Sequence, residues 1–317
     1  MSRRSRPDDT PAGRPFGGIR RAAVIGGARV VVVGDTGLDV VVRAVALPVP
    51  GGDARAEITV RPGGAGANTA AWLAALGVDP LLVARVGADP AAAQVRDELT
   101  AAGVRCALAA DPDAPTCCVV VLVDGAGQRS MLADRGAAAR FAPGDVAPAA
   151  MAGARHLHLS GYLLLDRSSR AGALAALAAA RAGGLTTSVD PQAAALLTDP
   201  AGFLADVAGV DLLLPSRAEL AALTGSTDPA SATGLLDLVG AVAVTAGHEG
   251  ATWVDRDLTV AVPAEPAAVV DSTGAGDAFD AGLLAAWLAG AAPADALRAG
   301  TAAGARAVAR PGARPAR

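Results

Sequence analysis

Short apolar runs alternate with segments of small residues along most of the chain. The clearest runs lie at 30–33, 81–84, 210–214 and 239–245, and further strands are predicted at 156–161 and 187–191. Continuous apolar runs of this length are typical of strands that are buried on both faces of a parallel sheet. Segments rich in Ala and Leu, which favour helices, lie between them. These helices are predicted at 69–76, 91–102, 168–182, 278–289 and 294–308. The alternation predicts an α/β fold with a mainly parallel, doubly wound central sheet.

Two stretches depart from this rhythm and predict a small β-sheet lid. Positions 40–62 and 116–133 hold short β-like pieces separated by Pro, Gly and Asp-Gly turns, a pattern that predicts hairpins. No Pro- or Ser-rich linker divides the chain, so we expect one domain over 21–317, with lid strands drawn from these two stretches. Residues 1–20 hold several Arg, Pro and Gly and are predicted to form a disordered tail.

Composition narrows the classes of protein to consider. The formal net charge is -4, and no basic cluster with interleaved aromatic residues follows Arg21, which argues against a nucleic-acid partner. No apolar run reaches transmembrane length, so no membrane partner is expected. The chain has three cysteines, which fit neither a disulfide framework nor the spacing of metal ligands. A cytoplasmic location is therefore expected.

The absence of lysine excludes two families of phosphate-transfer proteins. All 27 basic residues are arginines. A Walker A loop needs its Lys near the β- and γ-phosphates, and a protein kinase needs the Lys of its third strand. Any phosphate site in this chain must therefore use backbone amides and Arg.

One glycine-rich stretch, DSTGAGD at 271–277, is a candidate phosphate site. An apolar run at 267–270 leads into it and a predicted helix leads out, so we expect a turn from a strand to a helix. Glycine adopts the positive φ angles of such turns easily, and the N–H groups at a helix N-terminus attract anions. Asp277 stands beside this site, where a base is needed for phosphoryl transfer to a hydroxyl. The alternative is a structural turn in which Asp277 only stabilises the helix dipole.

A second glycine cluster, PGGAGAN at 62–68, opens another predicted helix. Its spacing does not give the Gly-x-Gly-x-x-Gly of a dinucleotide loop, and it follows a hairpin rather than the first strand. Asn68 can both donate and accept hydrogen bonds. Asp35 and Asp39 follow the first predicted strand, on the side where open α/β sheets bind ligands. The alternative for this acidic pair is an ordinary loop.

His156 and His158 alternate to one face of a predicted strand. A metal pair is one interpretation, but no third ligand lies nearby in the sequence. A structural role in the core is therefore favoured. Cys117 and Cys118 lie in a β-like run, where they are expected to pack as small apolar side chains.

The two glycine-rich stretches together resemble the signatures of the ribokinase-like (PfkB) carbohydrate kinases. GGAGAN at 63–68 resembles the N-terminal signature, and DSTGAGD at 271–277 resembles the C-terminal one. Their order, their separation and the intervening rhythm also match, from about Val30 to Ala313. The resemblance implies a three-layer α/β/α domain with a mainly parallel central sheet and a β-sheet lid. It also implies ATP-dependent phosphorylation of a sugar or nucleoside hydroxyl.

The resemblance implies a role for each matching position. Asp277 resembles the catalytic base, and the amides of Gly274, Ala275 and Gly276 resemble the anion hole that stabilises phosphate charge. The implied substrate contacts are Asp35, Asp39, Gly63, Gly64 and Asn68. The implied nucleotide contacts are Ser216, Glu219, Thr245, Gly247 and Gly250, with Glu219 holding Mg²⁺ through water. The positions at which many members hold a monovalent cation, K⁺ here, are Asp271, Thr273, Ala307 and Gly312.

Two positions depart from the family pattern. Ser216 stands where the family usually has Asn, and its shorter hydroxyl would need a bridging water, which bears on Mg²⁺ affinity or on rate. Ala65 stands where ribokinases often carry Lys. We therefore expect a general sugar kinase rather than a strict D-ribose kinase.

The sequence thus predicts a kinase that uses ATP and Mg²⁺ to phosphorylate a hydroxyl of a small sugar or sugar derivative, with Asp277 as general base. A nucleoside kinase of the same fold is an alternative, which the low aromatic content of 3% supports less. A third hypothesis, supported only by Ser216, is a ligand-binding or regulatory relative that has lost activity. Edge strands in the lid would suit a homodimer.

Overall fold

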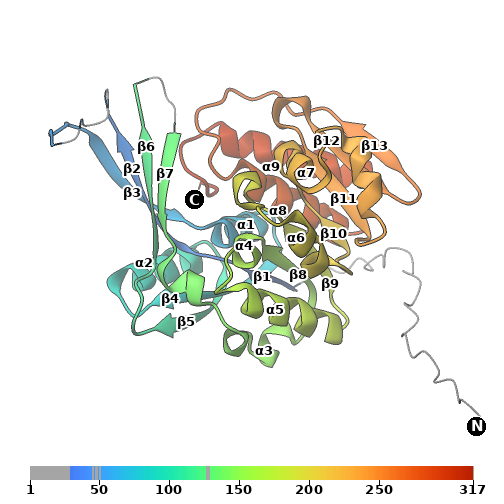
Figure 1. Cartoon of the computed structure of the whole chain (residues 1–317), viewed down its shortest axis with the longest axis horizontal. Coiled ribbons are helices and arrows are strands. Elements are labelled where there is room, and N and C mark those ends of the chain that lie inside the picture. The colour runs from blue at the N-terminus through green and yellow to red at the C-terminus, as the bar shows by residue number, and fades with distance from the viewer. Residues whose placement is uncertain (1–28, 45, 47–48, 50, 126–128, 317) are drawn as a thin grey trace, which may run out of the picture.

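The computed structural model describes residues 29–44, 46, 49, 51–125 and 129–316, and a large sheet runs through the middle of the molecule (Figure 1). Within these residues the sheet has nine strands in the order β13-β12-β11-β10-β9-β8-β1-β4-β5. The strands are β1 (Arg29–Val33), β4 (Asp79–Gly87), β5 (Arg105–Asp111), β8 (Ala154–Ser160), β9 (Thr186–Asp190), β10 (Leu212–Leu213), β11 (Ala241–Thr245), β12 (Ala251–Asp255) and β13 (Thr259–Val262). All neighbours from β5 to β11 pair in parallel, and β12 and β13 add an antiparallel edge. The prediction of a mainly parallel sheet is confirmed.

Helices cover both faces of this sheet, so the main body has three layers (Figure 1). The helices are α1 (Ala65–Ala75), α2 (Pro90–Ala101), α3 (Pro148–Met151), α4 (Tyr162–Leu165), α5 (Arg170–Ala182), α6 (Pro200–Val207), α7 (Arg217–Thr224), α8 (Ala275–Leu288) and α9 (Pro293–Val308). Alternate residues of a strand point to opposite faces. Val30 and Val32 accordingly pack with residues of α1, α8 and α9, whereas Val31 and Val33 pack with residues of α5. None of the helices described is both long and apolar enough to cross a membrane.

A second sheet of four strands in the order β3-β2-β6-β7 forms the lid, which stands at one end of the main body (Figure 1). Its strands are β2 (Gly37–Arg43), β3 (Glu57–Gly63), β6 (Cys117–Val123) and β7 (Arg129–Asp134). β2 pairs antiparallel with β3 and parallel with β6, and β6 pairs antiparallel with β7. The lid therefore joins two hairpins that are distant in sequence. Its exposed apolar side chains include Ile58, Val60 and Leu132.

Several sequence predictions need correction. Residues 267–270 were expected to form a strand, but they have no regular secondary structure, and Val269 and Val270 are exposed. Pro263 and Pro266 precede them, and a proline cannot donate to a strand ladder. The strand β5 and the helices α3, α4, α6 and α7 were not predicted. The predicted tail at 1–20 lies outside the described residues.

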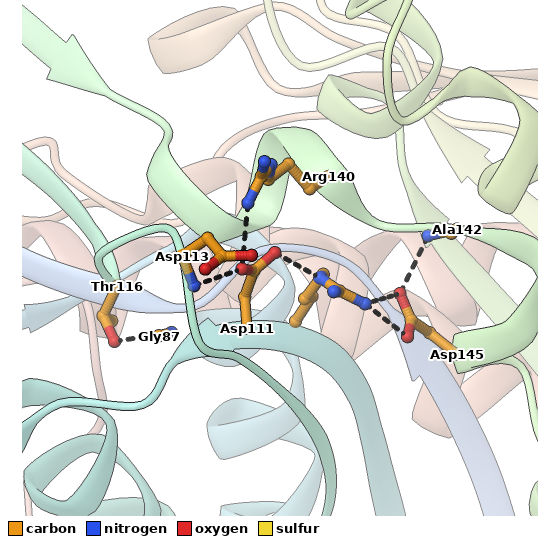
Figure 2. Close-up of polar contacts among 8 residues, drawn as sticks. Gly87, Asp111, Asp113, Thr116, Arg140, Ala142 and Asp145 are labelled. Carbon is orange, nitrogen blue, oxygen red and sulfur yellow. Dashed lines mark hydrogen bonds and ion pairs between the residues drawn. The ribbon is translucent and has the colours of Figure 1, made fainter.

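An ion network lies where the chain passes from the main sheet into the lid (Figure 2). Asp111, the last residue of β5, is buried and accepts hydrogen bonds from Arg85 Nε at 3.0 Å and Arg140 Nη1 at 2.9 Å. The backbone N–H of Asp113 also donates to Asp111, at 2.9 Å. Arg85 Nη1 in turn donates to Asp145 Oδ1 at 2.8 Å. The network thus ties β4 and β5 to the segment that follows the lid.

We expect Asp111→Asn to lower the melting temperature at neutral pH, because two arginines lose their carboxylate. The N–H of Asp113 and the two guanidinium groups hold the pKa of Asp111 below its usual value. The stabilisation is therefore present above the unfolded-state pKa of about 3.9 and is lost as the pH falls through the lower folded-state pKa. Thermal unfolding measured from neutral to acidic pH should show the difference between wild type and variant shrinking at low pH. Asp113→Asn is the matched control, and an equal loss in both variants would contradict the assignment.

Candidate active site

The carboxyl ends of the parallel strands and the lid enclose a cavity of about 480 Å³. It brings together most of the expected site residues: Asp35, Asp39, Gly64, Asn68, Ser216, Glu219, Thr245 and all of 274–277. Gly63 ends lid strand β3 and lies against the Asp39 carboxylate. The other two expected nucleotide contacts, Gly247 and Gly250, line a neighbouring cavity.

The turn before α8 lies between the two cavities and lines both of them. Gly274 adopts a φ of 73°, and a Cβ there would lie 2.6 Å from the Ala313 carbonyl oxygen, so both conformation and space require glycine. Gly276 lies in the first turn of α8, and a Cβ there would meet no atom within 4 Å, so it faces open space. Ala275 and Gly276 line both cavities. A helix N-terminus that opens onto such space suits the anionic phosphates of a nucleotide.

Asp277 is the carboxylate at this helix N-terminus, and its side chain is held from a distant part of the chain. Asn68 Nδ2 in α1 donates to Asp277 Oδ2 at 2.9 Å. Burial raises the pKa of Asp277 to about 7; the nearby carboxylates Asp35 and Asp39 add to the increase, and the amides of Asn68 and Gln192 oppose it. A carboxylate with a pKa near neutrality is well suited to accept and release a proton.

The cavity between the lid and the strands, which we call the acceptor cavity, is lined by two further carboxylates. Asp35 follows β1 and is buried, and Asp39 lies in lid strand β2. Burial, together with the charge of Asp35, raises the pKa of Asp39 to about 6. Gly64 has a φ of 91°, and a Cβ there would lie 2.5 Å from Thr36 Cα, so the glycine lets the start of α1 pack directly against the end of β1. The structure thus places the acidic pair and the second glycine cluster on one wall.

The neighbouring cavity has a volume of about 710 Å³ and lies along α8 and α9. Its lining includes Gly247, His248 and Gly250 on one side and Phe279 and Thr301 on the other. It shares Thr245, Ser272, Ala275 and Gly276 with the first cavity, so the two cavities meet at the start of α8. The size and the largely apolar lining fit a nucleoside, with the phosphates toward Gly276.

Ser216 and Glu219 form the N-terminal capping box of α7. Ser216 Oγ accepts from Glu219 N–H at 3.3 Å, and Glu219 Oε2 accepts from Ser216 N–H at 2.6 Å. Glu219 is buried and lines the acceptor cavity. One carboxylate oxygen therefore caps the helix. Carboxylate oxygens are also the ligands that Mg²⁺ prefers in proteins.

The expected cation ligands are only partly assembled around one point. Asp271 accepts from Thr273 N–H at 3.0 Å and Thr273 Oγ1 at 2.6 Å, and its other oxygen accepts from Gly312 N–H at 3.0 Å. The carbonyl of Ala307, within α9, accepts from the backbone N–H of Arg310 in the turn that follows, at 3.4 Å. These hydrogen bonds connect protein groups to one another and do not themselves indicate a bound ion. The K⁺ site therefore remains a prediction.

Several residues of the site were missed at the sequence level. Arg135, Tyr162 and Gln192 line the acceptor cavity. Arg314 donates to Asn68 Oδ1 at 3.3 Å and to the Gly63 carbonyl at 3.0 Å. None of these residues belongs to a glycine-rich motif, and only tertiary structure brings them to the site.

The two strand histidines are buried side chains of the core. His156 hydrogen-bonds to Thr186 Oγ1 and Ser188 Oγ, and His158 also bonds to Ser188 Oγ. No group of three or more His, Cys, Asp or Glu in the described ranges could hold a metal ion. The structural interpretation of these histidines is the one that the contacts support.

The fold and this site agree with a comparison at the level of protein families. The profile of the pfkB family carbohydrate kinases matches residues 28–317. The chain therefore belongs to this family of ATP-dependent carbohydrate kinases.

Two relatives match most of the chain. The ATP-dependent ribose-1-phosphate kinase of Halopiger xanaduensis is 33% identical over 263 residues, which cover 82% of this chain and 85% of that protein. A fructokinase of Klebsiella pneumoniae is 32% identical over 244 residues, covering 74% of this chain and 79% of that protein.

Solved structures extend the likeness to the whole fold. Arabidopsis thaliana ribokinase complexed with ribose and ATP has a TM-score of 0.75 and 26% identity, covering 91% of this chain and 95% of that one. The adenosine kinase of Sinorhizobium meliloti has a TM-score of 0.82 and 24% identity, covering 92% and 96%. The ribokinase-like fold expected from the sequence is confirmed.

We expect kcat/KM to rise as the pH increases through about 7, because Asp277 must lose its proton before it can accept one. In Asn68→Ala this rise should move to higher pH, since the amide hydrogen bond that favours the charged carboxylate is lost. The measurement is a pH profile of kcat/KM for both proteins. Thr69→Ser, one position along α1, is the matched control and should keep the wild-type profile. If the rise of kcat/KM occurs at the same pH in Asn68→Ala as in the wild type, the group that titrates is not Asp277.

Proposed function

We propose that this protein transfers the γ-phosphate of ATP to a hydroxyl of a small sugar or sugar derivative, with Asp277 as general base. The observation that carries the proposal is the position of Asp277. It stands at the N-terminus of α8, with an acidic acceptor cavity on one side and an open, amide-bearing turn on the other.

The residues divide the reaction between them. Asp35 and Asp39 bind hydroxyls of the acceptor, because carboxylate oxygens accept hydrogen bonds from O–H groups. Asp277 accepts the proton of the attacking hydroxyl as its oxygen bonds to the γ-phosphorus, and the bond to the leaving ADP oxygen breaks. The N–H groups of the turn at 274–276 stabilise the charge on the transferring group. The lid covers the acceptor and excludes water, which limits wasteful hydrolysis of ATP.

Mg²⁺ fits the nucleotide end of the site. Glu219 lies in the cavity wall near Thr245, at the junction with the nucleotide cavity. Bound there through water, the ion would neutralise phosphate charge. K⁺ near Asp271 and a homodimer through the exposed apolar side chains of the lid belong to the same proposal, as does a cytoplasmic location.

A sugar acceptor is favoured over a nucleoside by the lining of the acceptor cavity. Tyr162 is the one aromatic side chain among the lining residues, so the wall offers little surface on which a base could stack. The named activities of the two relatives, on ribose 1-phosphate and fructose, also involve sugars. The adenosine kinase likeness keeps a nucleoside as the second candidate. The inactive-relative hypothesis has little support, because Asp277 and the glycine turn are both present and in place.

Asp277→Asn should lower kcat about 10³-fold, because the amide cannot accept the hydroxyl proton. ATP affinity, measured by calorimetry, should stay close to wild type, since the turn amides are unchanged. The assay is ATP consumption with pentoses, hexoses, sugar acids, sugar phosphates and nucleosides, with and without K⁺. Turnover near that of wild type in the variant would rule out Asp277 as the base. If no compound is phosphorylated while ligands still raise the melting temperature, the binding-protein hypothesis gains instead.

Ser216→Asn should reduce the Mg²⁺ concentration needed for half-maximal rate, by up to about tenfold. The longer amide reaches farther into the cavity than the hydroxyl does. Asn caps helices as well as Ser does, so the melting temperature should not change. Ser216→Ala is the control for the cap and should lose about 1 kcal/mol of stability. An Mg²⁺ requirement that is the same in wild type and Ser216→Asn would exclude this residue from the metal site.

A further inference from the structure

A third cavity, of about 310 Å³, lies under the lid beside the acceptor cavity, and we call it the side cavity. Its lid wall consists of side chains from β2, β3 and β6, which include Asp39, Val41, Arg43, Arg61, Val121 and Val123. Its other wall comes from residues 269–273 and from Gly312 and Ala313. The side cavity shares Asp39, Val121, Ser272 and Thr273 with the acceptor cavity. A ligand in the acceptor cavity can therefore extend into it.

The strand register puts two arginines on the lid face that covers the site. Side chains two positions apart in a strand point to one face, so Arg43 lies on the same face of β2 as Val41 and Asp39. Arg61 in β3 is the antiparallel partner of Asp39, so its side chain also lies on that face. The carboxylate that is proposed to bind acceptor hydroxyls thus has both arginines on its own side of the lid. The mechanism above uses neither of them.

Arg61 reaches from the lid to the main body. A Cβ at Gly312 would lie 3.3 Å from Arg61 Nη1, so the guanidinium lies directly over this glycine. The C-terminal segment that contains Gly312 runs beside the lid strands (Figure 1). Arg61 is half-buried in this position, whereas Arg43 is exposed.

Neither arginine has a partner among the residues that the structure describes. No hydrogen bond or ion pair joins Arg43 or Arg61 to any of them. Glu57, which lies opposite Arg43 in the register, is exposed and does not line the cavity. By contrast, Arg85 and Arg217 both form ion pairs with carboxylates. A half-buried guanidinium has lost part of its hydration, and an anion that accepts its hydrogen bonds restores what was lost.

Two further arginines at the site have partners of their own. Arg135, in the acceptor cavity, forms an ion pair with Asp166 at 3.6 Å and lies over the ring of Tyr162. Arg314 donates to Asn68 Oδ1 at 3.3 Å and to a backbone carbonyl at 3.0 Å. The positive charge that is available to a ligand therefore lies in the side cavity.

The two carboxylates in the side cavity do not neutralise this charge. The Asp39 carboxylate is directed toward Gly63 and forms no ion pair with its register partner in the described fold. Asp271 accepts two hydrogen bonds from its own turn and one from the backbone N–H of Gly312. Both carboxylates are thus turned to other groups, and both guanidinium groups are left to a ligand.

We propose that the side cavity binds a phosphate group of the acceptor, so that this enzyme phosphorylates a sugar phosphate. This inference rests on the proposed function and names its substrate class. The free hydroxyl oxygen of the acceptor bonds to the γ-phosphorus, its proton passes to Asp277, and the bond to the ADP oxygen breaks. The product is a sugar bisphosphate. Arg61 donates hydrogen bonds to the acceptor phosphate, and Arg43 adds positive charge at the exposed side of the cavity.

A phosphate suits the side cavity better than a carboxylate or a neutral hydroxyl group does. A phosphate monoester carries nearly two negative charges at neutral pH, which match two guanidinium groups. The forked N–H groups of arginine also match the geometry of phosphate oxygens. The remaining lid wall is formed largely by Val41, Val121 and Val123, whose side chains offer no hydrogen bonds to the hydroxyls of an uncharged sugar.

The first test compares acceptors that differ only in the phosphate. With pentoses, hexoses and their monophosphates as substrates, kcat/KM for the phosphorylated acceptor should exceed that for the same sugar without phosphate about 100-fold. Sugar acids form a third arm, which tests a carboxylate in place of the phosphate. Equal values for sugars and their phosphates would overturn the proposal, and so would a preference for sugar acids over sugar phosphates.

The second test removes the arginine. Arg61→Ala should lower kcat/KM for the sugar phosphate about 30-fold, and it should reduce the preference over the unphosphorylated sugar by the same factor. Arg61→Lys should recover part of this loss, because it keeps the charge and lacks the fork. Arg55→Ala is the matched control, since Arg55 is exposed on the connection between β2 and β3 and does not line the cavity. A preference that is unchanged in Arg61→Ala, or reduced equally in Arg55→Ala, would contradict the assignment.

A binding measurement separates this inference from the proposed function. Calorimetric titration of Asp277→Asn with pentose and hexose monophosphates should show binding that a second substitution, Arg61→Ala, weakens about 30-fold. If they bind in this way but the wild type phosphorylates no acceptor, the side cavity is assigned correctly and the proposed function is wrong. If the wild type phosphorylates neutral sugars while sugar phosphates neither bind nor react, the proposed function stands and the phosphate site is excluded.

Discussion

The hydrogen bond between Asn68 and Asp277 joins two glycine-rich loops that are 209 positions apart. Each loop opens a helix, α1 or α8, and these helices pack side by side on one face of the sheet. The bond satisfies a buried carboxylate that would otherwise be costly to enclose. It also aims that carboxylate at the cavity. The two residues that it joins both line the cavity between the lid and the carboxyl ends of the strands.

The electrostatic potential of the site is dominated by several acidic side chains that lie close together at the carboxyl ends of the strands. Burial raises the pKa of Asp39, Asp190, Asp277 and Asp280, and the charges of neighbouring carboxylates add to each increase. Such a site can receive a polyanionic nucleotide only if part of this charge is neutralised. The N-terminus of α8 and a divalent cation would both supply positive charge for this purpose.

Features of the fold that depend on residues adjacent in sequence could be predicted, whereas features that depend on contacts between distant residues could not. The valine run of β1 and the glycines at 64 and 274 specify local conformation, so the strand and both loops were recognised from sequence. β5 was missed because its sequence, RCALAAD, lacks the β-branched residues typical of strands. The strand expected at 267–270 was wrong because two prolines lie just before it. The partners of Asn68, Arg314 and Asp277, and the positive φ of Gln192 are set by tertiary packing and leave no local signal.

The contacts that complete the site are among the longest in the chain. Arg314 donates to the Gly63 carbonyl across 251 positions, and Trp72 Nε1 donates to the Ala313 carbonyl across 241 positions. Contacts this distant in sequence close large loops, and the entropy cost of closing them is met only when the intervening strands and helices are packed. The site is therefore a property of the whole described fold, and no short segment of the chain can assemble it.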